Sequence, residues 1–270
     1  MRRSERQGRG AWAAVLLVAA AAWAAVMLGP AGRTASASGG RCGAPEDMVM
    51  LEHPLPHVAA RLAAGGPLTI VALGSSSTYG TGATSQKHSY PSRLRAYLAE
   101  HYPAIEVRVL NRGVGGEEAE AMADRIDRDV LASHPDLVIW QVGTNAVLTN
   151  DDPAKFGEAL GAGLRKIVDA HADVFLVNPQ YAPAMLQHPR YRDMLHVLDA
   201  VAYEEDVAVF PRFAMMRHWA DEGLMPLKLM LARDHLHMTD VSYDCLAREV
   251  AISIEAAAVP PKQDLVATTF

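Results

Sequence analysis

Short apolar runs alternate with amphipathic segments along most of the chain after residue 67. Apolar runs bounded by turn residues predict β-strands at residues 68–72, 105–110, 136–142, 173–178 and 207–210. The third run, DLVIWQV, is almost continuously apolar, which is typical of a strand buried on both faces of a sheet. Apolar positions at helical spacing predict helices at residues 90–101, 117–131, 153–170, 190–205, 212–222 and 240–258.

This alternation predicts an α/β protein with a parallel, doubly wound sheet. In such a sheet the carboxyl ends of neighbouring strands share one edge, and ligands bind in the crevice above that edge. The turns that follow the first three strands are therefore where functional side chains are expected. No segment repeats at a fixed period, which excludes a solenoid.

The first 37 of the 270 residues have the pattern of a secretion signal. Four arginines within the first nine residues precede an uncharged run at 11–28, and Ala35-Ser36-Ala37 is a small-residue cleavage motif. We therefore expect a signal peptide at 1–37 and an exported protein, periplasmic or extracellular. The alternative is an uncleaved N-terminal membrane anchor, since the apolar run is just long enough to span a bilayer.

The rest of the chain divides into an N-terminal arm at 38–66, one domain at 67–258 and a flexible tail at 259–270. The arm has a helical pattern near 57–64. Residues 1–37 hold five arginines and one glutamate, so their removal changes the formal charge from −6 to −10. Such an acidic protein is not expected to have nucleic acid or an anionic membrane as its main partner.

The chain has two cysteines, Cys42 in the arm and Cys245 in the last predicted helix. In an oxidising compartment they are the only intramolecular pair available, and a disulfide between them would tie the arm to that helix. Two unrelated buried thiols are the alternative, because the sequence does not give the distance between the two α-carbons.

Four turns carry groups whose chemistry is complementary. Ser76 offers a hydroxyl, Gly116 an unhindered backbone N–H, and Asn145 an amide; Asp234 and His237 offer a carboxylate that can orient an imidazole. Acyl transfer needs a nucleophile, a base, a group that orients the base, and donors for an oxyanion. Singly, each has a structural alternative, because serine and asparagine cap helices and glycine forms turns.

The sequence blocks around these residues resemble those of the GDSL-type or SGNH hydrolases. The blocks are Gly74-Ser75-Ser76-Ser77-Thr78, Asn111-Arg112-Gly113-Val114-Gly115-Gly116, Gly143-Thr144-Asn145 and Asp234-His235-Leu236-His237. The resemblance covers about residues 68–258 and implies a flavodoxin-like three-layer α/β/α sandwich with a five-stranded parallel sheet. It also implies Ser76 as nucleophile, His237 as base and Asp234 as its orienting acid. The oxyanion hole would consist of Ser76 N–H, Gly116 N–H and the Asn145 side chain.

The chain departs from the family pattern at two positions. Ser75 stands where an aspartate usually precedes the nucleophile, and Ala146 stands where an aspartate often follows the asparagine of the third block. Neither aspartate performs the chemical step in the family, so activity is still expected, although the loss of negative charge bears on substrate preference. Three consecutive serines leave Ser75 and Ser77 as alternative nucleophiles. The G-x-S-x-G elbow of α/β-hydrolases is not matched, because Thr78 replaces its second glycine.

Other residues carry weaker signals. His235 and His237 lie close together, but no cysteine or carboxylate cluster at ligand spacing accompanies them, so we expect no metal and no cofactor. Gln180 and Tyr181, after the fourth strand, either reach a substrate or form a plain surface loop. A Met-rich stretch is either an acyl pocket or packed core. Its members are Phe213, Met215, Met216, Leu224, Met225, Leu227, Leu229, Met230 and Leu231.

Together these features predict a secreted or periplasmic serine esterase that hydrolyses acyl or acetyl esters of carbohydrates or small lipids. Two alternatives stay open: an acyltransferase of an exported polysaccharide, and a non-catalytic glycan-binding member of the same fold. The complete set of Ser76, Asp234 and His237 argues against binding alone. The expected partner is a small-molecule or glycan ester, with a membrane contact only if residues 1–37 stay attached; the oligomeric state is not predicted.

Overall fold

The computed structural model describes Gly40 and residues 42–258, so the predicted signal at 1–37 and the predicted tail at 259–270 lie outside the described residues. Within that part, parallel strands form one five-stranded sheet in the order β2-β1-β3-β4-β5. This is the flavodoxin-like order, whose change of direction between β1 and β3 creates a crevice at the carboxyl edge. The strands are β1 (Leu68–Gly74), β2 (Val107–Gly113), β3 (Leu137–Gln141), β4 (Asp173–Val177) and β5 (Ala208–Phe210).

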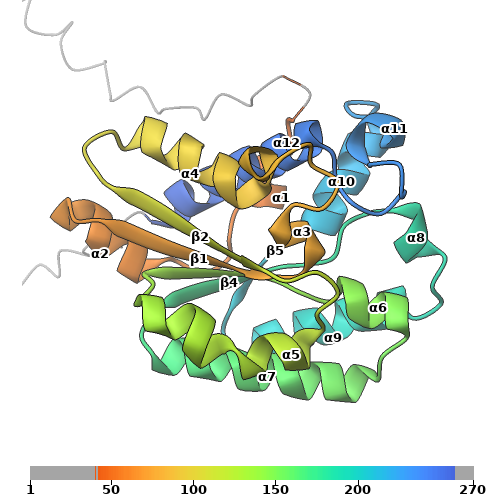
Figure 1. Ribbon diagram of the computed structural model, residues 1–270, viewed down its shortest axis with the longest axis horizontal. Helices are drawn as coiled ribbons and strands as arrows, with labels where there is room; N and C mark the ends of the chain where they lie inside the picture. Colours follow the sequence, from red (N-terminus) through yellow and green to blue (C-terminus); the bar gives the residue numbers. More distant parts are fainter. Residues whose placement is uncertain (1–39, 41, 259–270) are drawn as a thin grey trace, which may run out of the picture. The chain divides into compact units, whose positions relative to one another are not determined.

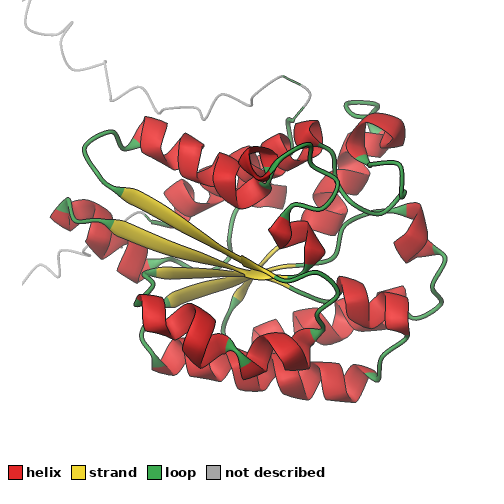
Figure 2. Cartoon of the chain, viewed as in Figure 1, coloured by secondary structure: helices red, strands yellow, loops and turns green. Residues whose placement is uncertain are grey.

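Helices cover both faces of the sheet (Figures 1 and 2). One face carries α1 (Glu46–Val49), α4 (Tyr90–His101), α10 (Arg212–Asp221) and α12 (Asp240–Ala257), and the other carries α5 (Ala119–Asp124), α7 (Pro153–Asp169) and α9 (Tyr191–Glu204). Short helices lie between these: α2 (Pro56–Ala64), α3 (Ser76–Tyr79), η1 (Gln86–His88), α6 (Thr144–Thr149), α8 (Pro183–Leu186) and α11 (Leu227–Met230). The predicted three-layer α/β/α sandwich is confirmed.

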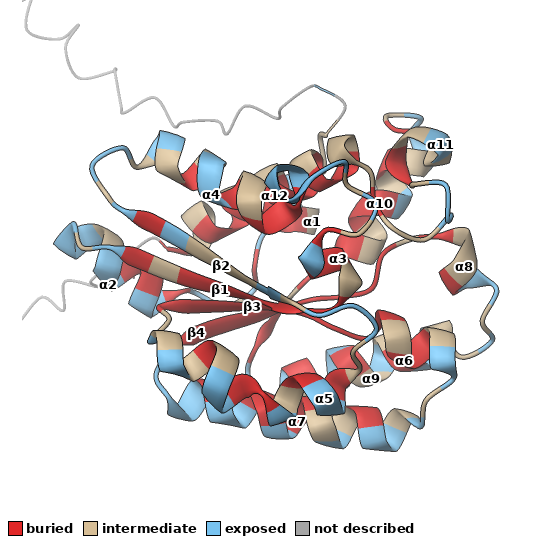
Figure 3. Ribbon diagram, in the orientation of Figure 1, coloured by how far each residue is buried: buried red, intermediate tan, exposed pale blue. Residues whose placement is uncertain are grey.

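The core lies along the central strands, where β3 and β4 are buried over their whole length (Figure 3). Trp140 of β3 is completely buried and packs on α7 at Gly163, where a β-carbon would lie 2.4 Å from the indole ring. Burying a side chain of this size stabilises the fold by about 2–3 kcal/mol. The Met-rich stretch belongs to the same core, since Met215, Met216 and Met230 are completely buried.

The predicted helix at 117–131 is wrong in its second half. Helix α5 ends at Asp124, and a π-helical turn (Ile126–Val130) and a 3₁₀ turn (Leu131–Ser133) follow it. The change comes at Arg125, whose buried guanidinium turns inward and donates from Nη2 to Gly74 O at 3.2 Å and to Arg112 O at 2.9 Å. The π-helical turn begins directly after this residue, and a helical periodicity reveals neither the turn nor the bonds to distant strands.

The arm packs against the end of the domain. Cys42 and Cys245 are joined in a disulfide with their α-carbons 5.0 Å apart, so the pairing expected from the sequence is present in the structure. Trp219 Nε1 donates to Gly43 O at 3.1 Å, and Leu55 N donates to Ala257 O at 2.9 Å. The arm thus has contacts besides the disulfide. No helix in the described part of the chain is both long and apolar enough to cross a membrane.

Candidate active site

Ser76 is the first residue of α3, directly after β1. Its neighbours Ser75 and Ser77 are each only 1% exposed, whereas Ser76 is partly exposed. The backbone N–H of Ser75 donates to Oε1 of the buried Gln141 at 3.3 Å, and the hydroxyl of Thr78 donates to the same oxygen at 3.2 Å. Among the three consecutive serines, the middle one is therefore the one that faces the crevice.

The second block holds α3 against the sheet. A β-carbon at Gly113 would lie 2.1 Å from Tyr79 N, so only glycine allows α3 to approach β2 this closely. Asn111 Nδ2 also donates to Thr78 O at 2.8 Å. Asn111 and Gly113 therefore position the serine turn, although sequence analysis quoted them only as part of a block.

Asp234 and His237 lie in the turn between α11 and α12. Asp234 Oδ1 accepts the backbone N–H of Leu236 at 3.0 Å and of His237 at 2.9 Å, and Oδ2 contacts His237 Nδ1 at 2.6 Å. Partial burial alone would raise the pKa of Asp234, but these hydrogen bonds from His237 and Leu236 hold it below its ordinary value. Asp234 is thus an ionised acceptor at neutral pH.

The imidazole of His237 connects this turn to the serine. His237 Nε2 lies 2.8 Å from Ser76 Oγ, across a sequence separation of 161 residues. Because an ionised Asp234 can only accept, Nδ1 carries the proton and the lone pair of Nε2 faces the hydroxyl. The three side chains form a continuous chain of hydrogen bonds in which a proton can pass from Ser76 to His237.

The His237 turn is anchored on both sides. An antiparallel bridge joins Leu231 to Met238, and Ala232 N donates to His237 O at 2.8 Å. On the other side, Thr84 binds both carboxylate oxygens of Asp240, through its backbone N–H at 2.7 Å and its hydroxyl at 2.5 Å. The loop that follows α3 is therefore tied to the first residue of α12.

The candidate oxyanion donors besides Ser76 N–H are Gly116, which follows β2, and Asn145, which follows β3. Gly116 has φ +83°, a left-handed conformation that favours glycine, and a β-carbon on Gly115 would lie 3.9 Å from Ser76 Cβ. Asn145, on α6, donates from Nδ2 to Glu117 O at 2.6 Å. The amide has a second hydrogen, which leaves one donor for an oxyanion. Gly115 is thus next to Ser76, and Asn145 is bonded to Glu117, so the residues on either side of Gly116 connect the serine turn to α6.

The sequence did not reveal that two polar residues, Gln180 and Arg212, are buried next to the site. Gln180 is completely buried, so the interpretation of its segment as a plain surface loop is wrong for this residue. Arg212 is also completely buried and contacts Gln180. A polar residue after a strand usually signals a loop, so only the three-dimensional packing identifies these two.

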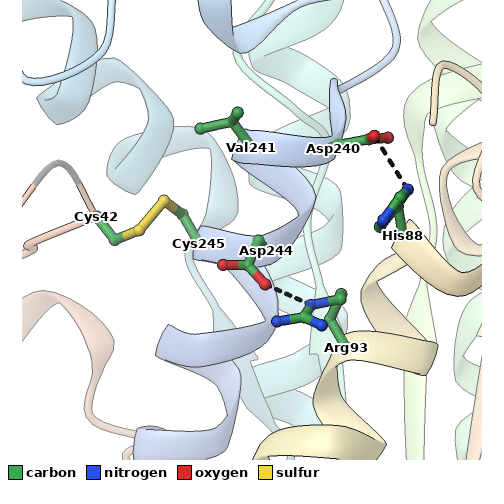
Figure 4. A pocket seen from close by; sticks show the side chains of 7 residues that line it. All are labelled: Cys42, His88, Arg93, Asp240, Val241, Asp244 and Cys245. Atoms are coloured by element: carbon green, nitrogen blue, oxygen red, sulfur yellow. Dashed lines mark hydrogen bonds and ion pairs between the residues drawn. A yellow bond between two sulfur atoms is a disulfide. The ribbon is translucent and has the colours of Figure 1, made fainter. Parts of the chain in front are cut away.

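A pocket of about 620 Å³ lies at the start of α12, beside the disulfide (Figure 4). Its ionisable side chains are paired: His88 Nδ1 lies 3.0 Å from Asp240 Oδ2, and Arg93 Nε lies 2.5 Å from Asp244 Oδ1. Cys245 completes this wall of the pocket. None of the three triad residues lines it, so it is separate from the candidate active site.

Nothing in residues 42–258 brings together three histidine, cysteine, aspartate or glutamate side chains in a geometry that could hold a metal. His235 has a positive φ of +57° and is exposed, which separates it from the hydrogen-bonded His237.

Comparison with known proteins agrees with this architecture. The model of the Non-GDSL lipase-like family matches residues 41–259, whereas a search of curated proteins found no significant match. The fold is similar to that of a two-domain esterase active on acetylated mannans, with a TM-score of 0.67 and 19% identity over 80% of this chain. This chain covers 57% of that esterase, little more than half of its length.

This chain matches nearly the whole length of two further structures. A lipase/acylhydrolase from Enterococcus faecalis has a TM-score of 0.59 and 24% identity over 73% of this chain and 99% of that chain. A variant of an acetyl xylan esterase from Geobacillus stearothermophilus has a TM-score of 0.58 and 23% identity over 70% and 95%.

At these identities the likeness establishes the fold, and it confirms the resemblance to GDSL-type hydrolases at that level. The family description also suits a chain in which Ser75 replaces the aspartate of the GDSL block. Since the family model spans most of the sequence, this protein belongs to the Non-GDSL lipase-like family.

Proposed function

We propose that the protein is an exported serine esterase that removes acyl groups, acetyl above all, from carbohydrates or small lipids. The observation that carries the proposal is the hydrogen-bonded chain of Ser76, His237 and Asp234, with 2.8 Å and 2.6 Å between successive side chains. A non-catalytic glycan-binding protein needs no such arrangement, and the geometry therefore favours catalysis.

In the acylation step, Ser76 Oγ attacks the ester carbonyl carbon while His237 Nε2 takes the hydroxyl proton. The tetrahedral intermediate places a negative oxygen near the N–H groups of Ser76 and Gly116 and the Asn145 amide. The intermediate collapses with cleavage of the bond to the alcohol oxygen, which leaves with the proton held by His237. Asp234 stabilises the imidazolium that exists between these two proton transfers.

In the deacylation step, His237 Nε2 takes a proton from water, and the resulting hydroxide attacks the acyl-Ser76 carbonyl. The same donors hold the second oxyanion. Collapse of this intermediate breaks the bond to Ser76 Oγ, which regains its proton from His237, and releases the carboxylic acid. No cofactor enters either step.

The substrate class is supported by two of the similar structures, one described as active on acetylated mannans and the other as an acetyl xylan esterase. The hydrogen bonds that hold the His237 turn and the Ser76 turn are formed by residues of this chain. Export is supported by the secretion pattern at 1–37 and by the Cys42–Cys245 disulfide.

The test is hydrolysis of p-nitrophenyl acetate by the oxidised protein and by three serine variants. Ser76→Ala should lower kcat by about four to six orders of magnitude, because the members of a triad act as a unit. Ser75→Ala and Ser77→Ala should keep measurable activity. A fluorophosphonate probe should label the wild type on the peptide that contains Ser76, as read by mass spectrometry.

Inactivation by Ser75→Ala alone, or a probe on another residue, would overturn the assignment of Ser76. The acceptor is tested by incubating the protein with an acetylated oligosaccharide and a second, unacetylated glycan. Acetate release without transfer supports an esterase, whereas acetylation of the acceptor identifies an acyltransferase with the same acyl-enzyme.

A further inference from the structure

A buried polar side chain lies between the two halves of the candidate site. Gln180 Oε1 accepts the Thr144 hydroxyl at 2.9 Å, and Gln180 Nε2 donates to Leu236 O at 3.4 Å. Thr144 immediately precedes Asn145, and Leu236 immediately precedes His237. One side chain therefore contacts the neighbours of both the candidate oxyanion donor and the candidate base.

Arg212 determines which way the Gln180 amide points. The guanidinium is a donor only, and its Nη2 lies 2.8 Å from Gln180 Oε1, so the amide atom facing it has to be the oxygen. The Thr144 hydroxyl donates to the same oxygen. With Oε1 held by two donors, Nε2 is left to face Leu236 O.

The charge on Arg212 is poorly explained by stability alone. The side chain is completely buried, no ion pair to it is found in the described part of the chain, and its Nη1 has no hydrogen-bond partner there. Burial lowers its pKa to about 10, which still leaves the group charged at neutral pH. A buried charge without a counter-ion costs folding free energy. The hydrogen bond from Arg212 Nη2 to Gln180 Oε1 gives the buried charge another role, which is to orient the Gln180 amide.

We propose that Gln180, oriented by Arg212, is a positioning residue. It holds Asn145, at the start of α6, in register with the Asp234–His237 turn. This inference rests on the proposed function of those residues. Asn145 lies on α6, directly after β3, and the His237 turn follows α11, so the two come from distant parts of the chain. A displacement of about 1 Å between reacting groups can cost about 100-fold in rate, which makes a rigid link between them valuable.

The experiment replaces Gln180 in the full oxidised protein. Gln180→Met keeps the length of the side chain and removes its three hydrogen bonds, to Thr144, Arg212 and Leu236. We expect kcat for p-nitrophenyl acetate to fall about 10- to 100-fold with KM within about twofold. Gln180→Glu keeps the acceptor and neutralises Arg212, but it cannot donate to Leu236 O. This variant should be at least as stable as the wild type and still lose activity. Gln187→Met, at an exposed glutamine directly after the end of α8, is the matched control.

Two readouts separate positioning from a general loss of structure. The double variant Gln180→Met with Asn145→Ala should lose little more activity than Asn145→Ala alone. Once the Asn145 amide is removed, Gln180 has no amide left to position. The downfield proton resonance of His237 Nδ1–H should be sharp in the wild type and in Gln187→Met, and broadened in Gln180→Met.

Fully additive losses in the double variant, or wild-type kcat and a sharp resonance in both Gln180 variants, would overturn the proposal. If the wild type cleaves no ester at all, the proposed function fails. The imidazole resonance still tests the link in that case, since it needs no substrate.

Discussion

The two halves of the candidate site are held in place by different means. Ser76 and Asn145 follow the buried strands β1 and β3, and Gly116 follows the edge strand β2, which is only partly buried; the sheet sets the positions of all three. Asp234 and His237 lie on a turn at the surface, where the Asp234 side chain is 46% exposed. In Figure 3, β1, β3 and β4 are largely buried, whereas the edge strand β2 is more exposed.

The difference teaches where the precision of each half comes from. In the strand-end half, the core itself fixes the geometry, so a change that moves it also affects folding. In the turn half, short-range bonds fix the geometry, since Asp234 accepts from two backbone N–H groups and from His237 within four residues. Changes in this turn should therefore alter catalysis with little effect on the stability of the fold.

The strongest test of the turn half is Asp234→Asn. The asparagine oxygen can still accept the backbone N–H of Leu236 and of His237, but its NH₂ group faces the imidazole as a donor and favours the wrong tautomer. We expect kcat to fall about 10⁴-fold, with a midpoint of thermal unfolding close to that of the wild type. Asp193→Asn, on the exposed surface of α9, is the control. A large loss of stability would show that the turn is not held locally.

The corresponding test of the strand-end half is Asn145→Ala. The amide contributes when the negative oxygen forms, so kcat should fall about 10²- to 10³-fold, or about 3–4 kcal/mol, with little change in KM. The variant also loses the bond to Glu117 O, so its stability should fall as well. Thr149→Ser, at the exposed end of the same helix, keeps the hydroxyl that donates to Asn145 O and should match the wild type in kcat. An unchanged kcat in Asn145→Ala would leave Asn145 with a structural role only.

Cys245 of the disulfide lies close in sequence to the Asp234–His237 turn. Removing the disulfide tests whether the arm supports that turn. Cys42→Ala should lower the free energy of unfolding by about 2–4 kcal/mol, measured in denaturant, because the unfolded chain is no longer cross-linked. We expect kcat within about twofold of the wild type, since the bonds of the Asp234–His237 turn are unaffected. Reductant should bring the wild type to the level of the variant and leave the variant unchanged. Two free thiols in the untreated protein would contradict the pairing.

The smallest expected effect is a change in the pH dependence of stability, and it concerns Glu249, a buried residue of α12. Its side chain is 2% exposed, and burial raises its pKa to about 7, an effect that Arg248 partly offsets. The folded state therefore keeps the proton while the unfolded chain loses it above the ordinary value of 4.5. Stability from this group is undiminished below pH 4.5, falls as pH rises to about 7, and stays low above that.

Glu249→Gln should remove this pH dependence. We expect the free energy of unfolding to increase by about 2–3 kcal/mol at pH 8 and to change little at pH 4, with kcat unchanged. Glu100→Gln, an exposed position on α4, should show neither effect. Equal gains at both pH values would mean that packing, and not ionisation, limits stability at this position.

Much of the fold was predictable because its signals are local. The run at 136–142 is apolar on both faces, and the structure buries every residue of β3 accordingly. The helix at 117–131 was predicted wrongly, because the turn at Arg125 depends on bonds to Gly74 and Arg112 in other strands. Periodicity reports which face of an element is apolar, and it contains no information about such bonds.

The candidate site divides in the same way. The sequence by itself determined which chemical groups stand at the strand ends, and its blocks predicted Ser76, Asp234 and His237 as site residues. Only the tertiary structure decided that Ser76, and not Ser75 or Ser77, faces the imidazole, and that Gln180 is buried between two turns. The physical reason is that side-chain type and spacing are local properties of the chain. Direction, burial and hydrogen-bond partners depend on how distant elements pack together.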